Sequence, residues 1–150
     1  MLWRALLAFV ALPGIVAMAL PAWLAAVSLR ESGSLHPLGL VPMLLGLVLL
    51  LWCVRDFYVA GRGTLAPWSP PRHLVTIGLY RHSRNPMYVA VASMLLGWWL
   101  SSGSARLAIY AIVVITAFHV RVVFGEEPWL ARTHGAAWEE YRARVPRWLL

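Results

Sequence analysis

The sequence predicts an all-α membrane protein with about four transmembrane helices and a C-terminal amphipathic helix. Of its 150 residues, 61% are hydrophobic and 13% are charged, whereas a soluble domain carries about 25% charged residues. Four spans of about 20 residues would use roughly 80 residues, which fits a single domain of this length. The composition excludes an ordinary soluble globular protein and a disordered chain.

Apolar runs along the chain predict the positions of the spans. The first run could instead be a signal peptide, because Arg4 precedes it and Ala17-Met18-Ala19 resembles a cleavage site. The apolar core of a signal peptide is about 7–15 residues long, and this run is longer, which favours a retained span. The predicted spans cover about residues 5–29, 38–54, 86–100 and 107–124.

Two other segments, residues 55–85 and 125–150, are predicted to lie at the membrane surface. The first is rich in Arg, Gly and Pro, which makes it too irregular for a span. The second has apolar residues at helical spacing, with Glu140 and Arg144 paired on the other face, and predicts an amphipathic helix over residues 126–145. The residues that recur at this spacing are Leu130, His134, Ala137, Trp138, Tyr141 and Val145.

The basic residues predict the orientation of the chain in the membrane. The net charge is +7, and all 13 basic residues are Arg. In a soluble protein this would suggest nucleic-acid binding, but in an apolar chain it is typical of cytoplasmic loops. With both termini in the cytoplasm, all the arginines except Arg30 and Arg106 are cytoplasmic. We therefore expect both surface segments on the cytoplasmic face and no nucleic-acid partner.

Several common catalytic motifs are absent from the sequence. It contains no Gly-rich phosphate loop, no serine nucleophile elbow and no Cys-x-x-Cys pair. The histidines lack the i,i+4 spacing of a metal-binding pair, so we expect no metal site. The single cysteine, Cys53, lies in an apolar run and is expected to pack in the interior.

Polar side chains are concentrated in two places. Residues 74–88 place Arg, His, Asn and Tyr where the third span begins. A helix start can bind a carboxylate or phosphate; the alternative is an Asn85-Pro86 helix cap with interfacial anchors. Glu126 and Glu127 follow the fourth span. They could bind a ligand, or they could neutralise nearby arginines and stabilise the helix that follows.

Three short pieces of the chain are informative together. They are Gly61-Arg62-Gly63-Thr64 with Pro67, Pro70 and Pro71; Leu74-Val75-Thr76 through Gly78 and Tyr80 to Arg84-Asn85-Pro86-Met87-Tyr88; and Glu126-Glu127, Leu130, Gly135, Trp138, Tyr141 and Val145-Pro146-Arg147. In this order they resemble the isoprenylcysteine carboxyl methyltransferase and phospholipid methyltransferase superfamily of integral-membrane enzymes, over about residues 57–148. The first piece is similar to bacterial members, which implies a bacterial inner membrane.

The resemblance implies a pocket for S-adenosyl-L-methionine on the cytosolic side. Asn85 replaces the family's His, which removes a titratable group but keeps hydrogen bonding. The family's substrate-facing Arg falls at Val122, so Arg121 is one position away from it. The implied cofactor-binding residues are His73, Leu74, Val75, Tyr80, Asn85, Pro86, Met87, Tyr88 and Glu126, and the catalytic candidates are Arg84, Arg121 and Glu127.

The implied activity is methyl transfer to a lipophilic or amphiphilic acceptor that enters from membrane lipid. A carboxylate acceptor needs only an Arg to orient it, whereas an ammonium must first lose a proton to Glu127 or to water. A thiol acceptor prefers a thiolate near Arg. The sequence offers both Arg and Glu, so it leaves the acceptor atom open, as it does the oligomeric state.

Two other functions compete with methyl transfer. A non-catalytic membrane subunit or binding protein on the same scaffold is the main alternative, favoured by Asn85 and by the displaced Arg121. A transporter is disfavoured, because no ionisable residue lies in the middle of a predicted span.

Overall fold

The computed structural model describes residues 10–32, 35–60 and 74–149, and within these residues it contains helices and no strand. The elements η1 and η4 are π-helical, and η2 and η3 are 3-10 turns. In chain order the elements are η1 (Val10–Ala19), α2 (Leu20–Ser32), η2 (Pro37–Gly39), α3 (Leu40–Ala60), η3 (Gly78–Arg81), α4 (Pro86–Ser102), α5 (Ala105–Arg121), η4 (Val122–Glu126), α6 (Glu127–His134) and α7 (Ala136–Arg144).

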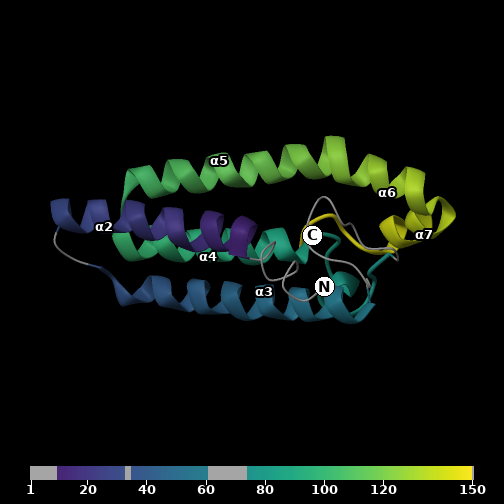
Figure 1. Cartoon of the computed structure of the whole chain (residues 1–150), viewed down its shortest axis with the longest axis horizontal. Coiled ribbons are helices and arrows are strands. Elements are labelled where there is room, and N and C mark those ends of the chain that lie inside the picture. The colour runs from purple at the N-terminus through teal and green to yellow at the C-terminus, as the bar shows by residue number, and fades with distance from the viewer. Residues whose placement is uncertain (1–9, 33–34, 61–73, 150) are drawn as a thin grey trace.

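Helix α4 lies at the centre of the bundle. Helices α2, α3 and α5 pack along it, and α6 and α7 extend beyond the end at which α4 begins (Figure 1). Buried apolar side chains fill the space between α4 and its neighbours. They are Ala17, Leu50, Ala90, Val91, Met94 and Leu95.

Three helical segments of the described chain are long and apolar enough to cross a membrane: Pro13–Arg30, Pro37–Phe57 and Ala105–His134. Helix α4, predicted as another span, has 17 residues. Its length of about 26 Å is close to the roughly 30 Å hydrocarbon core of a bilayer. Large apolar side chains are exposed on the outer faces of α3 and α5, an arrangement that lipid tolerates better than water. The predicted all-α membrane class is therefore confirmed.

Pro21 lies within the first span, and two distant side chains bind carbonyl groups of the turn before it. A proline has no N–H, so one carbonyl group of the preceding turn loses its helical donor: that of Ala17 in an α-helical register, or that of Val16 in a π-helical register. The Tyr110 hydroxyl donates to Val16 O at 2.8 Å, and Trp98 Nε1 donates to Ala17 O at 2.9 Å. Because unpaired carbonyl groups are costly inside a bilayer, these bonds fix the first span to α4 and α5.

Two of the predicted boundaries are wrong. Arg55 and Asp56 do not end the second helix, because α3 continues to Ala60 and its Asp56 side chain is buried. The helix predicted over residues 126–145 is divided at Gly135, where φ is +50°. Its first part continues directly from α5 through η4. Glycine adopts positive φ without steric cost, and the apolar periodicity on either side does not reveal such a break.

The two arginine-rich segments, where the structure describes them, lie at the same end of the bundle. This end, called here the arginine-rich end, is where α3 finishes and α4 begins (Figure 1). The opposite end holds Arg30 and Arg106. The described arginines at the arginine-rich end are Arg55, Arg81, Arg84, Arg121, Arg132, Arg142, Arg144 and Arg147.

Glycines allow close backbone contact between α4 and the η2–α3 region. A Cβ on Gly97 would lie 2.6 Å from the Gly39 carbonyl oxygen and 2.8 Å from the Met43 backbone nitrogen. A Cβ on Gly46 would lie 2.5 Å from the Ala90 carbonyl oxygen. Small residues at such crossings let membrane helices approach closely, so α3 and α4 depend on them.

We predict that Gly97→Ala destabilises the protein by about 1–3 kcal/mol, because the new methyl group overpacks this contact. Gly125→Ala is the matched control, since a Cβ there meets nothing within 4 Å. Thermal unfolding in detergent should show a lower Tm for Gly97→Ala and no loss for Gly125→Ala. Equal Tm values for the two variants would contradict the observed helix crossing.

Candidate functional site

The turn that leads into α4 is held by the end of α3. Gly78 has φ +56°, and a Cβ on it would overlap the Asp56 carboxylate. The Leu79 N–H donates to Asp56 Oδ2 at 3.4 Å. The Tyr80 ring packs against Phe57, with ring centroids 5.5 Å apart. These contacts explain why the Asp56 side chain is buried. They also fix the position of the loop that follows the turn, residues 82–85.

Helix α7 packs against the same turn from the other side. Its Trp138 and Tyr141 side chains form a small apolar cluster with Val145, against which Leu74 packs. The Tyr141 hydroxyl donates to the Tyr80 carbonyl oxygen at 2.7 Å, and burial raises the pKa of this phenol well above its usual range. The phenol therefore stays neutral and acts as a fixed donor that ties α7 to η3.

Residues 145–149 cross the start of α4 and are bound there by its loop. The backbone N–H of Arg84 donates to the carbonyl oxygen of Pro146 at 2.9 Å. Asn85 Nδ2 donates to Arg147 O at 3.0 Å, and Ser83 Oγ donates to the same oxygen at 3.4 Å. The predicted Asn85 side-chain cap is therefore wrong: Asn85 is at the N-cap position without a capping bond, because its amide binds the 145–149 segment.

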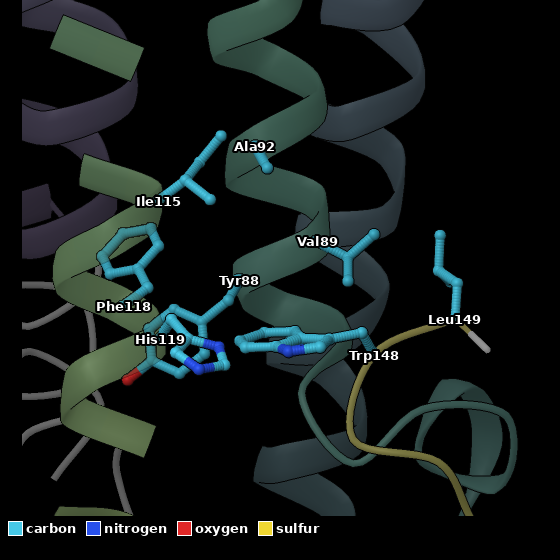
Figure 2. A pocket seen from close by; sticks show the side chains of 8 residues that line it. All are labelled: Tyr88, Val89, Ala92, Ile115, Phe118, His119, Trp148 and Leu149. Atoms are coloured by element: carbon cyan, nitrogen blue, oxygen red, sulfur yellow. The ribbon is translucent and has the colours of Figure 1, made fainter. Parts of the chain in front are cut away.

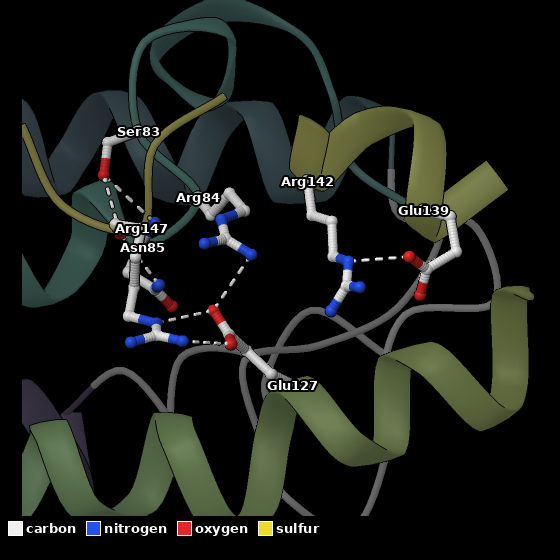
Figure 3. Close-up of polar contacts among 7 residues, drawn as sticks. All are labelled: Ser83, Arg84, Asn85, Glu127, Glu139, Arg142 and Arg147. Carbon is white, nitrogen blue, oxygen red and sulfur yellow. Dashed lines mark hydrogen bonds and ion pairs between the residues drawn. The ribbon is translucent and has the colours of Figure 1, made fainter. Parts of the chain in front are cut away.

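Glu127, the first residue of α6, holds two guanidinium groups (Figure 3). Arg147 donates from Nε to Oε1 at 2.9 Å and from its terminal nitrogen to Oε2 at 2.8 Å. Arg84 lies 3.1 Å from Oε1, with 11% of its side chain exposed, and Glu127 is 15% exposed. The paired carboxylate raises the pKa of Arg147, whereas burial lowers the pKa of Arg84 and Glu127 opposes that shift. Two cations on one anion leave a local excess of positive charge.

The Arg84 side chain also retains an unused donor. Its guanidinium carbon lies 5.4 Å from the centre of the Trp138 ring, a cation–π contact. Its Nε is buried and has no hydrogen-bond partner among the described residues. A buried N–H without an acceptor is costly, so this position favours an incoming acceptor such as a carboxylate.

Glu126, the residue before Glu127, joins the start of α4 to the end of α5. The Tyr88 hydroxyl donates to Glu126 Oε1 at 2.5 Å, across a sequence separation of 38 residues. Arg121 donates from Nε to the same oxygen at 2.7 Å. Glu126 is 32% exposed, about twice the fraction of Glu127. Of the two carboxylates, Glu126 is therefore the more accessible to a ligand.

A cavity of about 460 Å³ opens between α4 and α5 beside Tyr88 (Figure 2). Its size is within the range of about 300–1,000 Å³ usual for ligand pockets. The Phe118 ring lies 4.5 Å from that of Tyr88, and Trp148 forms an offset stack with His119 at 6.0 Å. The lining residues are Tyr88, Val89, Ala92, Ile115, Phe118, His119, Trp148 and Leu149.

The structure divides the candidate residues from the sequence into two groups. One group meets at the arginine-rich end: Arg84, Asn85, Tyr88, Arg121, Glu126 and Glu127. Of these, only Tyr88 lines the cavity. The other group packs in the interior or against α3 and α7: Leu74, Val75, Tyr80, Pro86 and Met87. His73 lies outside the described residues.

Three residues of this site were not among the candidate site residues from the sequence. Arg147 belongs to a motif that carries the family resemblance, but nothing in the sequence pairs it with Glu127. His119 and Trp148 are separated by 29 positions and meet only because residues 145–149 return to the start of α4. The one available signal was the polar character of His119 near the end of an apolar run.

Comparisons with known proteins identify a family and a relative. A family model described as phospholipid methyltransferase matches residues 34–137. The chain is similar to the Delta(14)-sterol reductase TM7SF2 of Mus musculus, with 35% identity over 92 residues, which are 61% of this chain and 22% of that protein. The match thus spans about a fifth of this curated relative. No solved structure matches the chain.

We predict that Arg147→Ala releases residues 145–149 from the start of α4. Loss of the paired hydrogen bonds to Glu127 should raise amide hydrogen exchange in this segment by about 10-fold. Arg144→Ala is the control, because its ion pair with Glu140 is on the surface, with both side chains more than 70% exposed. Unchanged exchange in Arg147→Ala would show that the ion pair does not hold the segment.

Proposed function

The chain belongs to the phospholipid methyltransferase family, and we propose that it transfers a methyl group from S-adenosyl-L-methionine to a lipophilic or amphiphilic acceptor. One observation carries this proposal: Tyr88 and Glu126, from segments far apart in sequence, form a hydrogen bond at the wall of the α4–α5 cavity. A cofactor site at Tyr88 and Glu126 would therefore lie next to an apolar acceptor site in the cavity.

The residues at the arginine-rich end fit the groups of this cofactor. The unpaired Arg84 Nε and the excess positive charge around it suit the cofactor's carboxylate. The accessible Glu126 carboxylate suits its ammonium group or ribose hydroxyls. The aromatic rings of Tyr88 and Trp148 suit its adenine or its sulfonium, the latter through a cation–π contact.

When bound, the cofactor would supply an electrophilic methyl group on a sulfonium centre. The protein's task is then alignment and exclusion of water. The apolar wall formed by Val89, Ile115 and Phe118 would exclude water from the acceptor side. Arg121 would orient Glu126 through their ion pair. Arg84 and Glu127 lie outside the cavity lining, so we assign them to cofactor binding and to positioning residues 145–149.

The protein is an integral membrane protein, and we further propose its orientation. The arginine-rich end would face the cytoplasm of a bacterial inner membrane, with both termini on that side. The polar cofactor would then enter from the cytosol, and the acceptor would enter from the membrane lipid between α4 and α5.

A second candidate function is reduction of a polycyclic lipid. It is favoured by the 35% identity with a Delta(14)-sterol reductase, a relative that is much longer than this match. A reductase would need a hydride donor, and its product would gain hydrogen rather than a methyl group. Incubation with native lipid extract and methyl-labelled S-adenosyl-L-methionine separates the two, because only methyl transfer labels a lipid.

We predict that Glu126→Gln and Tyr88→Phe both weaken binding of S-adenosylhomocysteine. Loss of a charge-assisted hydrogen bond should reduce the affinity of Glu126→Gln by about 10-fold or more. The effect of Tyr88→Phe should be smaller, because the ring remains. Calorimetric titration of the protein in detergent measures both.

Glu140→Gln is the control for these titrations, since Glu140 is 72% exposed on α7 and, within the described part of the chain, its ion pair is with Arg144 of the same helix. Its affinity should equal that of the unmodified protein. If the unmodified protein binds no cofactor, or if Glu126→Gln binds it equally well, the proposed site is refuted.

A further inference from the structure

One wall of the α4–α5 cavity comes from a segment outside the two helices. Among the described lining residues, only Trp148 and Leu149 belong to neither α4 nor α5. Figure 2 shows the Trp148 indole reaching across the cavity toward His119, and the centres of the two rings are 6.0 Å apart. Displacement of residues 145–149 would therefore open the cavity on the side of the arginine-rich end, while both helices stay in place.

The attachment of residues 145–149 differs along the segment. Val145, where α7 ends, is 8% exposed and packs with Trp138 and Tyr141. Leu149 is 66% exposed. Between them, Arg147 is bound through its side chain to Glu127 and through its carbonyl oxygen to the loop before α4. The segment is thus fixed at α7, and the contacts of Arg147 decide whether the rest of it covers the cavity.

The ion pair between Arg147 and Glu127 can open without leaving an unpaired carboxylate. Glu127 also binds Arg84, at 3.1 Å, and keeps this partner when Arg147 departs. The Arg147 side chain is 35% exposed, so water can solvate it after release. Breaking an enclosed ion pair is costly mainly when one charge remains without a partner. Sharing one carboxylate between two guanidinium groups therefore makes this contact reversible.

A second anion at this place would oppose the opening. Two guanidinium groups beside one carboxylate repel each other, and Figure 3 shows that Arg142, drawn in the same view, is paired with Glu139 instead. The Arg84 Nε has no partner among the described residues. A carboxylate can bind it without displacing Glu127, which contacts a terminal nitrogen of Arg84. The added negative charge balances the two cations and so favours retention of Arg147.

We propose that residues 145–149 are a lid over the α4–α5 cavity, and that Arg84, Glu127 and Arg147 hold it closed when a cofactor carboxylate is bound. The inference rests on the proposed methyl transfer and deepens it, because it assigns the regulation of that site. The closed lid separates the cavity from the cytosol, so that Trp148 excludes water from the reacting groups. Departure of the cofactor opens the lid. By linkage, closure strengthens cofactor binding by the same factor.

The first test measures lid closure through one amide. The backbone N–H of Arg84 donates to the carbonyl oxygen of Pro146, so its hydrogen exchange reports on the lid. Exchange is followed by NMR in nanodiscs with saturating S-adenosylhomocysteine or with its decarboxylated analogue, which lacks only the carboxylate. S-adenosylhomocysteine should slow exchange of this amide by about 10-fold or more, and the analogue should have a much smaller effect. Equal slowing by the two bound ligands, or none by either, overturns the proposal.

The second test uses two variants that favour the open lid. Arg147→Ala removes the contact with Glu127, and Pro146→Gly keeps the carbonyl oxygen that Arg84 binds but gives the backbone more freedom. Both should lose most of the slowing by S-adenosylhomocysteine and bind it about 5-fold or more weakly, with little change in affinity for the analogue. Arg144→Ala is the control, since Arg144 pairs with Glu140 on the surface of α7.

Pro146→Gly separates a lid from a direct contact, because it removes no charged side chain from the cofactor site. If it binds both ligands as the unmodified protein does and keeps the slowing at Arg84, the lid is not coupled to the cofactor and the proposal fails.

The third test measures access to the cavity. Val89 lines the cavity, and Val89→Cys is labelled with N-ethylmaleimide in nanodiscs; Cys53 is 0% exposed, and its background is measured in the unmodified protein. S-adenosylhomocysteine should slow labelling by about 5-fold or more, and the decarboxylated analogue should leave the rate nearly unchanged. An equal rate with and without bound S-adenosylhomocysteine would show that no lid closes.

The outcomes distinguish this inference from the proposed function. If the unmodified protein binds S-adenosylhomocysteine but neither exchange at Arg84 nor labelling at position 89 responds to its carboxylate, the inference fails and the proposed function stands. If the unmodified protein does not bind S-adenosylhomocysteine, both fail.

Discussion

The architecture of the candidate site depends on one carboxylate, that of Glu127, which binds two guanidinium groups from separate parts of the chain. Arg84 comes from the loop before α4, and Arg147 comes from the segment that follows α7. Because only 15% of the Glu127 side chain is exposed, water alone does not stabilise its charge, and the two guanidinium groups are needed as partners. Its contacts therefore hold three segments together, and they place Trp148 at the cavity between α4 and α5.

The two adjacent carboxylates have different surroundings. Glu127 is enclosed and fully engaged, so it stabilises the arrangement. Glu126, one position earlier, lies in the π-helical stretch η4 and faces Tyr88 and Arg121 with more of its surface exposed. A π-helical turn alters the direction of neighbouring side chains and is frequent at functional sites. At this widened turn Glu126 contacts Tyr88 and Arg121, whereas the next residue, Glu127, contacts Arg84 and Arg147.

Hydropathy predicted the fold class and the approximate position of the spans, because the cost of exposing polar backbone to lipid leaves few alternatives. The resemblance to a known family gave Tyr88, Glu126 and Arg84 as candidate site residues, and the structure places all three at the arginine-rich end. Asn85 is at the N-cap position, but its side chain makes no capping bond, because the tertiary fold supplies Arg147 O as the partner of its amide. His119 and Trp148 could not be paired from the sequence, because only the return of residues 145–149 brings them together.

The most direct test of the central claim is an experimental structure of the protein in a lipid nanodisc with S-adenosylhomocysteine bound. The account predicts that the ligand contacts both Tyr88 and Glu126 at the arginine-rich end, with the α4–α5 cavity opening beside its sulfur. A ligand bound elsewhere in the molecule, or a fold in which Tyr88 and Glu126 lie on opposite sides of the membrane, would contradict it.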